Sequence, residues 1–279
     1  MEKLTMEQVS SYCKQYGFIY PGSEIYGGFA NTWDFGPLGS RMINNIKDCW
    51  RKRFVQQRDN SYEIDCGIIM NPKVWEASGH AKSFNDPQVD CKECKKRYRA
   101  DNLISSVAPD VNPDLMTYEE MNKYIKENIK CPNCGKSNFT DLREFDLMFK
   151  TYRGTISDQK MEIYLRPETC QGEYINFQNV LRTAREKLPF TIAQVGKSFR
   201  NEVTPGNFLF RTIEFEQMEL QTFCKPGEDE AIFNFNKEQS MKFLTDLGVN
   251  PENLRFKDHD KLVFYASAAT DIQYNFATG

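Results

Sequence analysis

Apolar positions follow a helical period between residues 37 and 54. Apolar side chains recur there at every fourth position, and such a stripe predicts an amphipathic helix that buries one face. Pro37 suits the first helical position, so we expect the helix to begin there. The stripe by itself fits a helix that packs on the core of the protein. Its members are Leu38, Met42, Ile46, Trp50 and Phe54.

Five further segments carry helical signals. Thr5 and Thr117 each stand three residues before a Gln or a Glu, which is the pattern of a capping box at the start of a helix. Gly17 and Gly248 suit the ends of helices, because glycine adopts the left-handed conformation that a helix end often requires. We expect these helices at residues 5–16, 117–128, 171–187, 228–247 and 261–269.

A period of two replaces the helical period between residues 191 and 223. Two β-prone segments, 191–201 and 209–223, flank the residues Thr204-Pro-Gly-Asn207, which favour a turn. We therefore predict a β-hairpin. Alternate residues of a strand share a face, and one face of the second strand is more polar than a core-facing strand would be. This face consists of Arg211, Ile213, Phe215, Gln217, Glu219 and Gln221.

Two interpretations fit this polar face. In the first, it is a solvated surface on which Arg200 and Arg211 form ion pairs with glutamates of the neighbouring strand. In the second, it is the floor of a site for an anionic, aromatic ligand. The arginines would then bind phosphates, Phe215 would stack on a base, and Glu202 would accept a hydrogen bond from an exocyclic amine.

The composition restricts the class of protein. The 279 residues are 40% hydrophobic and 27% charged, which is ordinary for a soluble globular chain. A net charge of −3 argues against a protein that binds polyanions with its whole surface, so RNA contact would need a local basic patch. No apolar run approaches the roughly 18 residues of a membrane span, and the first residues have no apolar signal core. We therefore expect a cytoplasmic protein.

Four of the nine cysteines form two Cys-x-x-Cys pairs, Cys91 with Cys94 and Cys131 with Cys134. Each pair can present two thiolates to one tetrahedral ion, so the two pairs together predict a zinc site with four cysteine ligands. Such a site would be structural, because four protein ligands leave no position for water. The alternative is that these cysteines are free thiols without a metal.

Several blocks of the chain resemble class II aminoacyl-tRNA synthetases, and the glycyl-tRNA synthetases among them in particular. Phe199-Arg-x-Glu202, a loop and then Arg211-x-x-x-Phe215 resemble motif 2 of this class. Phe35-Gly-Pro-Leu-Gly39 before the long helix resembles motif 1. The resemblance covers essentially all 279 residues. Further similar blocks are residues 71–80, 99–104, 147–151 and 166–172.

The resemblance implies an α+β fold, in which an antiparallel β-sheet is flanked by helices and carries a zinc-ribbon-like insertion with four cysteines. We expect a first part of the catalytic core with the motif 1 helix at residues 1–90, the insertion at 91–143, and the second part with the motif 2 hairpin at 144–279. The motif 1 helix implies a homodimer. The sequence has no counterpart of motif 3 or of the C-terminal anticodon-binding domain, so we expect an N-terminal catalytic portion, which can be inactive alone.

The activity that the resemblance implies is ATP-dependent activation of glycine to glycyl-adenylate, with Mg²⁺, and transfer of glycine to tRNA(Gly). Arg200, Glu202 and Arg211 are the expected catalytic residues. Glu168 and Glu219 are expected to hold the glycine ammonium group, and no role is assigned to His80. The expected ATP site consists of Arg200, Asn201, Glu202, Phe210, Arg211, Thr212, Ile213, Glu214 and Phe215. The expected glycine site consists of Arg99, Glu168, Phe215, Glu216, Gln217, Met218 and Glu219.

Two other functions remain open at this point. A synthetase-like fold can serve as a non-catalytic accessory or nucleic-acid-binding protein, and the lack of motif 3 favours that alternative. The set of arginines and glutamates argues against it, because a subunit that does not bind ATP has no need of them. A free-standing zinc ribbon that binds RNA is disfavoured, because the cysteine pairs lie in an insertion within a larger fold.

Overall fold

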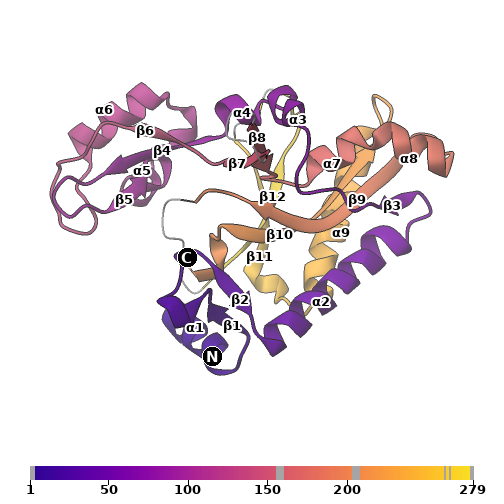
Figure 1. The fold of residues 1–279 in the computed structure, drawn as a ribbon, viewed down its shortest axis with the longest axis horizontal. Helices are drawn as coiled ribbons and strands as arrows, with labels where there is room; N and C mark the ends of the chain where they lie inside the picture. The colour runs from indigo at the N-terminus through magenta and orange to yellow at the C-terminus, as the bar shows by residue number, and fades with distance from the viewer. Residues whose placement is uncertain (1–3, 155–159, 203–207, 261, 264, 277–279) are drawn as a thin grey trace.

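The computed structural model describes residues 4–154, 160–202, 208–260, 262–263 and 265–276 (Figure 1). Their helices are α1 (Met6–Gln15), α2 (Pro37–Arg51), α3 (Pro72–Ala77), α4 (His80–Ser83), α5 (Ala100–Val107), α6 (Tyr118–Asn128), α7 (Cys170–Ile175), α8 (Phe177–Ala184) and α9 (Asp229–Asp246). Their strands are β1 (Ile19–Pro21), β2 (Trp33–Phe35), β3 (Ser61–Glu63), β4 (Asn85–Asp90), β5 (Arg97–Arg99), β6 (Arg143–Asp146), β7 (Phe149–Arg153), β8 (Met161–Leu165), β9 (Phe190–Phe199), β10 (Glu214–Phe223), β11 (Leu254–Asp258) and β12 (Thr270–Tyr274).

The hairpin of β9 and β10 is the centre of the main body. The two strands pair antiparallel over their whole length, from Phe199 opposite Glu214 to Phe190 opposite Phe223. The predicted hairpin is therefore confirmed, although the predicted turn at 204–207 lies outside the described residues. On the other side of β9, the short strand β3 pairs in parallel. This sheet is therefore mixed rather than wholly antiparallel as expected.

One face of the hairpin packs against α2 and α9. Trp50 and Phe54, at the end of the predicted apolar stripe, form a core with Phe243 of α9 and Ala193 of β9. The start of the stripe is not covered, because Leu38 and Met42 at the beginning of α2 are 48% and 55% exposed. The predicted core helix is thus confirmed for its second half. The opposite face of the hairpin is covered by α7 and α8, and this is the polar face predicted from the sequence.

A second lobe consists of β4, β5, β6, α5 and α6 and lies at one end of the molecule (Figure 1). Its sheet has the order β5-β4-β6. The lobe has a hydrophobic core of its own, which is drawn entirely from residues 89–139. The buried members are Val89, Cys91, Ala100, Leu103, Ile104, Met121, Ile125, Ile129, Cys131 and Phe139.

Local signals located most helix starts correctly. Both capping boxes are present, with Thr5 ahead of α1 and Thr117 ahead of α6. The helix expected at 261–269 is wrong, because the described residues of that range contain no helix and connect β11 to β12 instead. Within the described part of the chain, no helix has the length and apolar character needed to cross a membrane.

Candidate active site and cysteine centre

The polar face of the hairpin is fixed to the segment that precedes α7. The side-chain oxygen Oε1 of Gln217 accepts hydrogen bonds from the Ser198 hydroxyl at 2.9 Å and from the Thr169 backbone N–H at 3.0 Å. Ser198 and Thr169 are fully buried. Buried polar groups need such partners, because an unmade hydrogen bond inside a protein costs free energy. These two hydrogen bonds fix the centre of the polar face to the segment before α7.

Glu219 extends from this floor beside the same threonine. Its Oε2 accepts a hydrogen bond from Thr169 Oγ1 at 2.5 Å, and its Oε1 accepts one from Gln221 Nε2 at 3.1 Å. Burial raises the pKa of Glu219, and the neighbouring Glu168 charge adds to this, while the Thr169 hydroxyl works against it. Both donors are neutral, so the carboxylate has hydrogen-bond partners but no cation among the described residues.

Glu168 is the second carboxylate that the structure brings to this place. Burial opposes its ionisation, but hydrogen bonds from His80, Gln171 and Cys170 outweigh burial and lower the pKa of Glu168 to about 2. Gln171 Nε2 donates to Glu168 Oε1 at 2.6 Å, and the Cys170 thiol donates to the same oxygen at 3.1 Å. Glu168 is therefore held as an anion.

His80, to which the sequence analysis assigned no role, contacts Glu168. Its Nε2 lies 3.2 Å from Glu168 Oε1, and its Nδ1 lies 2.8 Å from the Ser78 hydroxyl. The ring packs edge-on against Trp75 and tilted against Phe84. These contacts fix the ring so that it orients Glu168. The sequence carried no signal for this pairing, because 88 positions separate the two residues.

Arg200 lies at the end of β9, between two aromatic rings. Its guanidinium carbon is 5.3 Å from the ring centres of both Phe84 and Phe215, and its Nε donates to the Pro167 carbonyl at 3.1 Å. Cation–π contacts of this kind position an arginine and leave its outer N–H groups available as donors. The alternative prediction of an ion pair between Arg200 and a glutamate is not seen in the described part of the chain.

Arg211 does form such a pair. Its Nη1 lies 2.9 Å from Glu202 Oε2 and 3.8 Å from Oδ2 of the buried Asp86. Arg99 joins the same group, because its Nη1 donates to Asp86 Oδ2 at 2.9 Å, and a second carboxylate, Asp101, also binds it. Burial raises the pKa of Asp86, while Arg99 opposes this shift. Arg99 therefore lies with Arg211 and Glu202 and not with Glu168 and Glu219.

The remaining residues of the expected site are distributed over both faces. Glu214 and Glu216 pair with Lys197 and Lys47 on the α2 side of the sheet, and Met218 packs there against the core of Trp50 and Phe54. The structure therefore does not bring these three to Glu219. Phe210 packs edge-on against Phe276, the Asn201 N–H donates to the Leu147 carbonyl, the Thr212 hydroxyl donates to the Glu214 carbonyl, and the Ile213 N–H donates to the Asn31 carbonyl.

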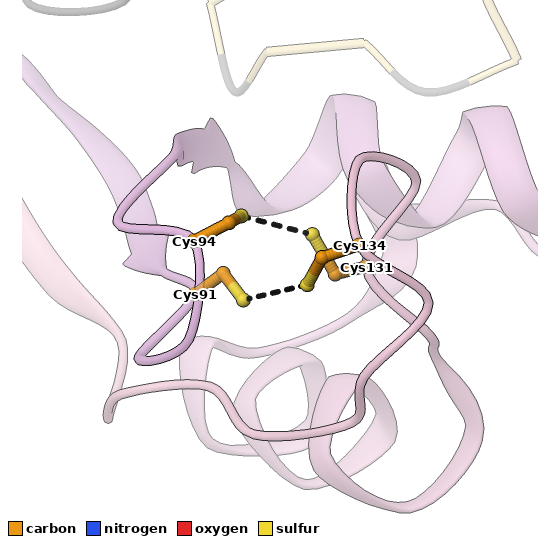
Figure 2. Close-up of side chains that lie close together, drawn as sticks. All are labelled: Cys91, Cys94, Cys131 and Cys134. Atoms are coloured by element: carbon orange, nitrogen blue, oxygen red, sulfur yellow. Dashed lines mark hydrogen bonds between the residues drawn. The ribbon is translucent and has the colours of Figure 1, made fainter.

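The four predicted cysteines meet in the second lobe. Cys91 Sγ lies 3.6 Å from Cys134 Sγ, and Cys94 Sγ lies 3.7 Å from Cys131 Sγ (Figure 2). All four sulfurs lie within 4.8 Å of one another. These separations are too long for disulfides, whose sulfurs are about 2.05 Å apart. They suit a tetrahedral ion, since a Zn–S bond of about 2.3 Å places neighbouring sulfurs about 3.8 Å apart.

The two Cys-x-x-Cys turns share one backbone pattern. In each, the N–H of the first cysteine donates to the carbonyl five residues on, and the N–H four residues on donates back to the cysteine carbonyl. Lys95 and Gly135, the residues at that fourth position, both have positive φ angles of 61° and 71°. The Tyr98 hydroxyl lies 3.3 Å from Cys131 Sγ. The donor set, spacing and turns thus fit a zinc ion held by four cysteines.

The chain is similar to known aminoacyl-tRNA synthetases. A family model described as the tRNA synthetase class II core domain (G, H, P, S and T) matches residues 149–276. A glycine–tRNA ligase of Caldanaerobacter subterraneus subsp. tengcongensis is 55% identical over 284 residues, covering 99% of this chain. A glycine–tRNA ligase of Clostridium acetobutylicum is 53% identical over 288 residues, covering 100% of this chain. The chain spans 62% of the length of each of these relatives.

A solved structure shares the fold. The crystal structure of the RNA binding domain of threonyl-tRNA synthetase from Cryptosporidium parvum Iowa II superposes with a TM-score of 0.52 and 17% sequence identity. The match covers 89% of this chain and 44% of that chain. At this identity the likeness concerns the mixed α/β fold alone.

Proposed function

We propose that the chain is the glycine-activating part of a glycine–tRNA ligase, a class II aminoacyl-tRNA synthetase to whose core domain residues 149–276 are similar. The observation that carries this proposal is the meeting of Glu168 and Glu219 on one face of the hairpin, next to Arg200. Two anionic groups suit an ammonium ion, and the arginine suits a phosphate. The similarity to glycine–tRNA ligases over nearly the whole chain supports the choice of glycine.

The reaction joins the glycine carboxylate to the α-phosphate of ATP, which enters as its magnesium complex, and releases pyrophosphate. One glycine oxygen forms a bond to phosphorus, and the bond from phosphorus to the bridging oxygen breaks. Such a step needs positioning and charge stabilisation rather than covalent help from the protein. Arg200, fixed by two rings and one carbonyl, is the residue for the α-phosphate.

The γ-phosphate and the adenine of ATP are both assigned to residues of the cluster of Arg211, Glu202 and Asp86 and to the adjacent Phe215. We assign Arg211 to the γ-phosphate and Glu202 to the adenine amine, with Phe215 stacking on the base. The ion pair between Arg211 and Glu202 holds both side chains in place before ATP binds. On binding, a phosphate would replace Glu202 as the partner of Arg211, and Arg99 would keep Asp86 compensated.

Glycine has no side chain to bind, so the site holds its ammonium group and excludes larger amino acids. Glu168 and Glu219 supply the charge, and Thr169 and Gln217 fix the walls. A missing methylene yields only about 1–3 kcal/mol of discrimination, whereas rejection of a bulkier amino acid by steric clash is easier. A small, closely packed site is therefore sufficient for glycine.

The cysteine centre is assigned to a structural zinc ion. Cys91, Cys94, Cys131 and Cys134 would hold it, and the ion would fix the two turns to one another. In this proposal residues 91–143 are a zinc-ribbon-like insertion, while 1–90 and 144–279 form the catalytic core.

The exposed start of α2, with Leu38 and Met42, suits a homodimer contact. The transfer step would then use tRNA(Gly) as the acceptor.

ATP–pyrophosphate exchange tests the proposal. The chain is assayed with glycine, alanine and serine, and again after it is joined to the remaining part of a relative's sequence. Exchange with glycine alone in either form would support the proposal. Exchange in neither form would favour the alternative, a non-catalytic synthetase-like protein that binds nucleic acid.

A further inference from the structure

Glu173 is a buried carboxyl group that the proposed reaction does not use. It lies in α7 and is fully buried, and neither of its carboxyl oxygens has a hydrogen-bond partner in the structure. A buried carboxylate without partners is very costly, because an ion removed from water loses its solvation. Such a residue therefore either carries a proton or awaits a cation.

The surroundings of Glu173 contain acids and thiols. Its carboxyl group lies close enough to Glu219 for the two charges to repel one another, and it also interacts electrostatically with Cys66, Cys170 and Tyr174. Among the described residues, no arginine, lysine or histidine lies within ion-pair distance of it. The described residues thus supply no positive charge that would stabilise an ionised Glu173.

The helix that carries Glu173 is pressed against the sheet. A Cβ atom on the neighbouring Gly172 would lie only 2.8 Å from the side chain of Cys66 and 3.1 Å from Gln194 Oε1. The glycine therefore permits a close approach that a larger residue would prevent. This packing holds α7 close to β9 and keeps Glu173 buried.

The two carboxyl groups are not equivalent. Glu219 accepts two hydrogen bonds, from Thr169 and Gln221, whereas Glu173 accepts none. Two neighbouring carboxyl groups in a poorly solvated place do not both ionise, and the one with fewer donors keeps the proton. Burial and the Glu219 charge accordingly raise the pKa of Glu173 to about 9.

We propose that Glu173 is a positioning residue of the amino-acid site that holds a proton while the site is empty and releases it to solvent when the ammonium group of the amino acid binds at Glu219. This inference rests on the proposed function. One positive charge enters as the ammonium group and one leaves as the proton, so the charge of the site stays constant. No covalent bond of the amino acid changes in this step.

The experiment measures protons released on binding. Glycyl-sulfamoyl-adenosine, a stable analogue of the adenylate with a free ammonium group, is titrated into the protein at pH 7 by calorimetry in phosphate and in Tris. The difference between buffers reports the protons exchanged. We expect the wild type to release about one proton per analogue bound, because its Glu173 is neutral beforehand. Glu173→Gln should release about none, since it keeps the shape but has no proton to lose.

The outcomes separate the possible failures. Glu230→Gln, which changes an exposed carboxylate of α9, is the matched control and should release protons like the wild type. Equal release from Glu173→Gln and the wild type would overturn the inference and point to Glu219 as the proton holder. Failure of the wild type to bind the analogue would overturn the proposed function, and the inference with it.

Infrared spectroscopy gives a second measurement that does not depend on counting protons. A protonated carboxyl group has its own C=O stretching band. We expect this band in the wild type, its loss when the analogue binds, and its absence from Glu173→Gln. A band that persists after the analogue binds would overturn the inference.

Discussion

The cysteine centre and the proposed amino-acid site both bring together side chains that are anionic when they bind a cation. The two sites are nevertheless built differently. The four thiols come from two short turns with the same backbone hydrogen bonds, and they face one another within 4.8 Å. The three carboxyl groups, Glu168, Glu173 and Glu219, come from one helix, the segment before it and a distant strand. Glu219 accepts a hydrogen bond from the neutral Thr169 hydroxyl, and Glu168 lies against His80. Glu173 has no hydrogen-bond donor among the described residues.

This difference suits a structural role for the cysteine centre and a ligand-binding role for the carboxyl groups. A resident ion can compensate the thiolates permanently, so the lobe around them can depend on the ion for its stability. In the proposed function, the carboxyl groups instead receive a cation only when an amino acid brings its ammonium group. We expect changes at the cysteines to alter structure, and changes at the carboxyl groups to alter affinity with little effect on structure.

The largest effect should come from Cys131→Ser, which removes a buried thiol from the centre. Binding of structural zinc supplies about 10–16 kcal/mol in small zinc domains, so the loss of one ligand should abolish zinc retention and loosen residues 85–146. Metal analysis should show a fall from about one zinc per chain to well under one. Hydrogen exchange should increase in the lobe but not in β9 and β10.

The matched control is Cys49→Ser, because Cys49 is an exposed cysteine of α2 outside the centre. It should leave the zinc content and the exchange pattern unchanged. Two outcomes would contradict the structural role of the cysteine centre. The wild-type chain could hold no zinc, or the lobe of Cys131→Ser could be as well protected from hydrogen exchange as that of the wild type.

Glu219→Gln tests the other side of the comparison. A hydrogen bond to a charged group is worth about 1.5–3 kcal/mol, so we expect the KM for glycine to rise about 10- to 100-fold. The KM for ATP should change less than about twofold, because Glu219 lies away from the Arg211 cluster. Unchanged glycine kinetics would remove Glu219 from the site. Glu230→Gln again serves as the control for loss of a carboxylate.

His80→Ala should have a smaller effect on the same constant. His80 orients the Glu168 carboxylate by a hydrogen bond, so its loss should weaken glycine binding about 3- to 10-fold near neutrality. The same hydrogen bond helps to lower the pKa of Glu168 to about 2, so the variant should also have a higher pKa at Glu168. Only the ionised carboxylate attracts the ammonium group, so the defect should grow as the pH falls. The measurement is the glycine KM between pH 5 and pH 8.

A double mutant establishes whether His80 acts through Glu168. If it does, His80→Ala should add little to the effect of Glu168→Gln, because coupled residues are not additive. Fully additive effects would show that the two residues act independently. Ser78→Ala, which removes only the partner of His80 Nδ1, should give an intermediate defect.

The same contrast explains what the sequence could predict. The cysteine centre follows from local spacing, since two residues between cysteines suffice to place two thiols on one turn. The capping boxes at Thr5 and Thr117 and the hairpin are likewise local, and the structure confirms them. A pattern that lies within a few neighbouring residues restricts the backbone to few conformations, so it can be predicted from the sequence.

The carboxyl site depends on packing between distant segments, and its details escaped the sequence. The pairing of His80 with Glu168 and the burial of Glu173 each depend on how α7 and the hairpin pack. The exposure of Leu38 has the same origin, because an apolar stripe does not say which part of it is covered. The parallel pairing of β3 with β9 likewise joins segments that are distant in the sequence, so no local pattern predicts it.

The last effect we predict concerns stability and again involves Glu173. Its pKa is raised to about 9 in the folded protein, against an ordinary value of 4.5, so the folded state holds a proton that the unfolded state loses above pH 4.5. Stability from this group is therefore complete below about pH 4.5 and declines as the pH rises towards 9. Glu173→Gln escapes this decline. Its melting temperature should match that of the wild type near pH 4.5 and exceed it by roughly 10 °C at pH 8, where the wild type has lost about 5 kcal/mol of stability from this group.

Thermal unfolding followed by circular dichroism between pH 4.5 and pH 8.5 measures this difference. The excess stability of the variant must increase with pH, because only the wild type carries the buried acid. A constant difference would mean that Glu173 does not change its protonation on folding. A difference that reversed sign would mean that Glu173 is ionised and compensated in the folded protein. The amino-acid site would then resemble the cysteine centre, with a resident partner for its charge.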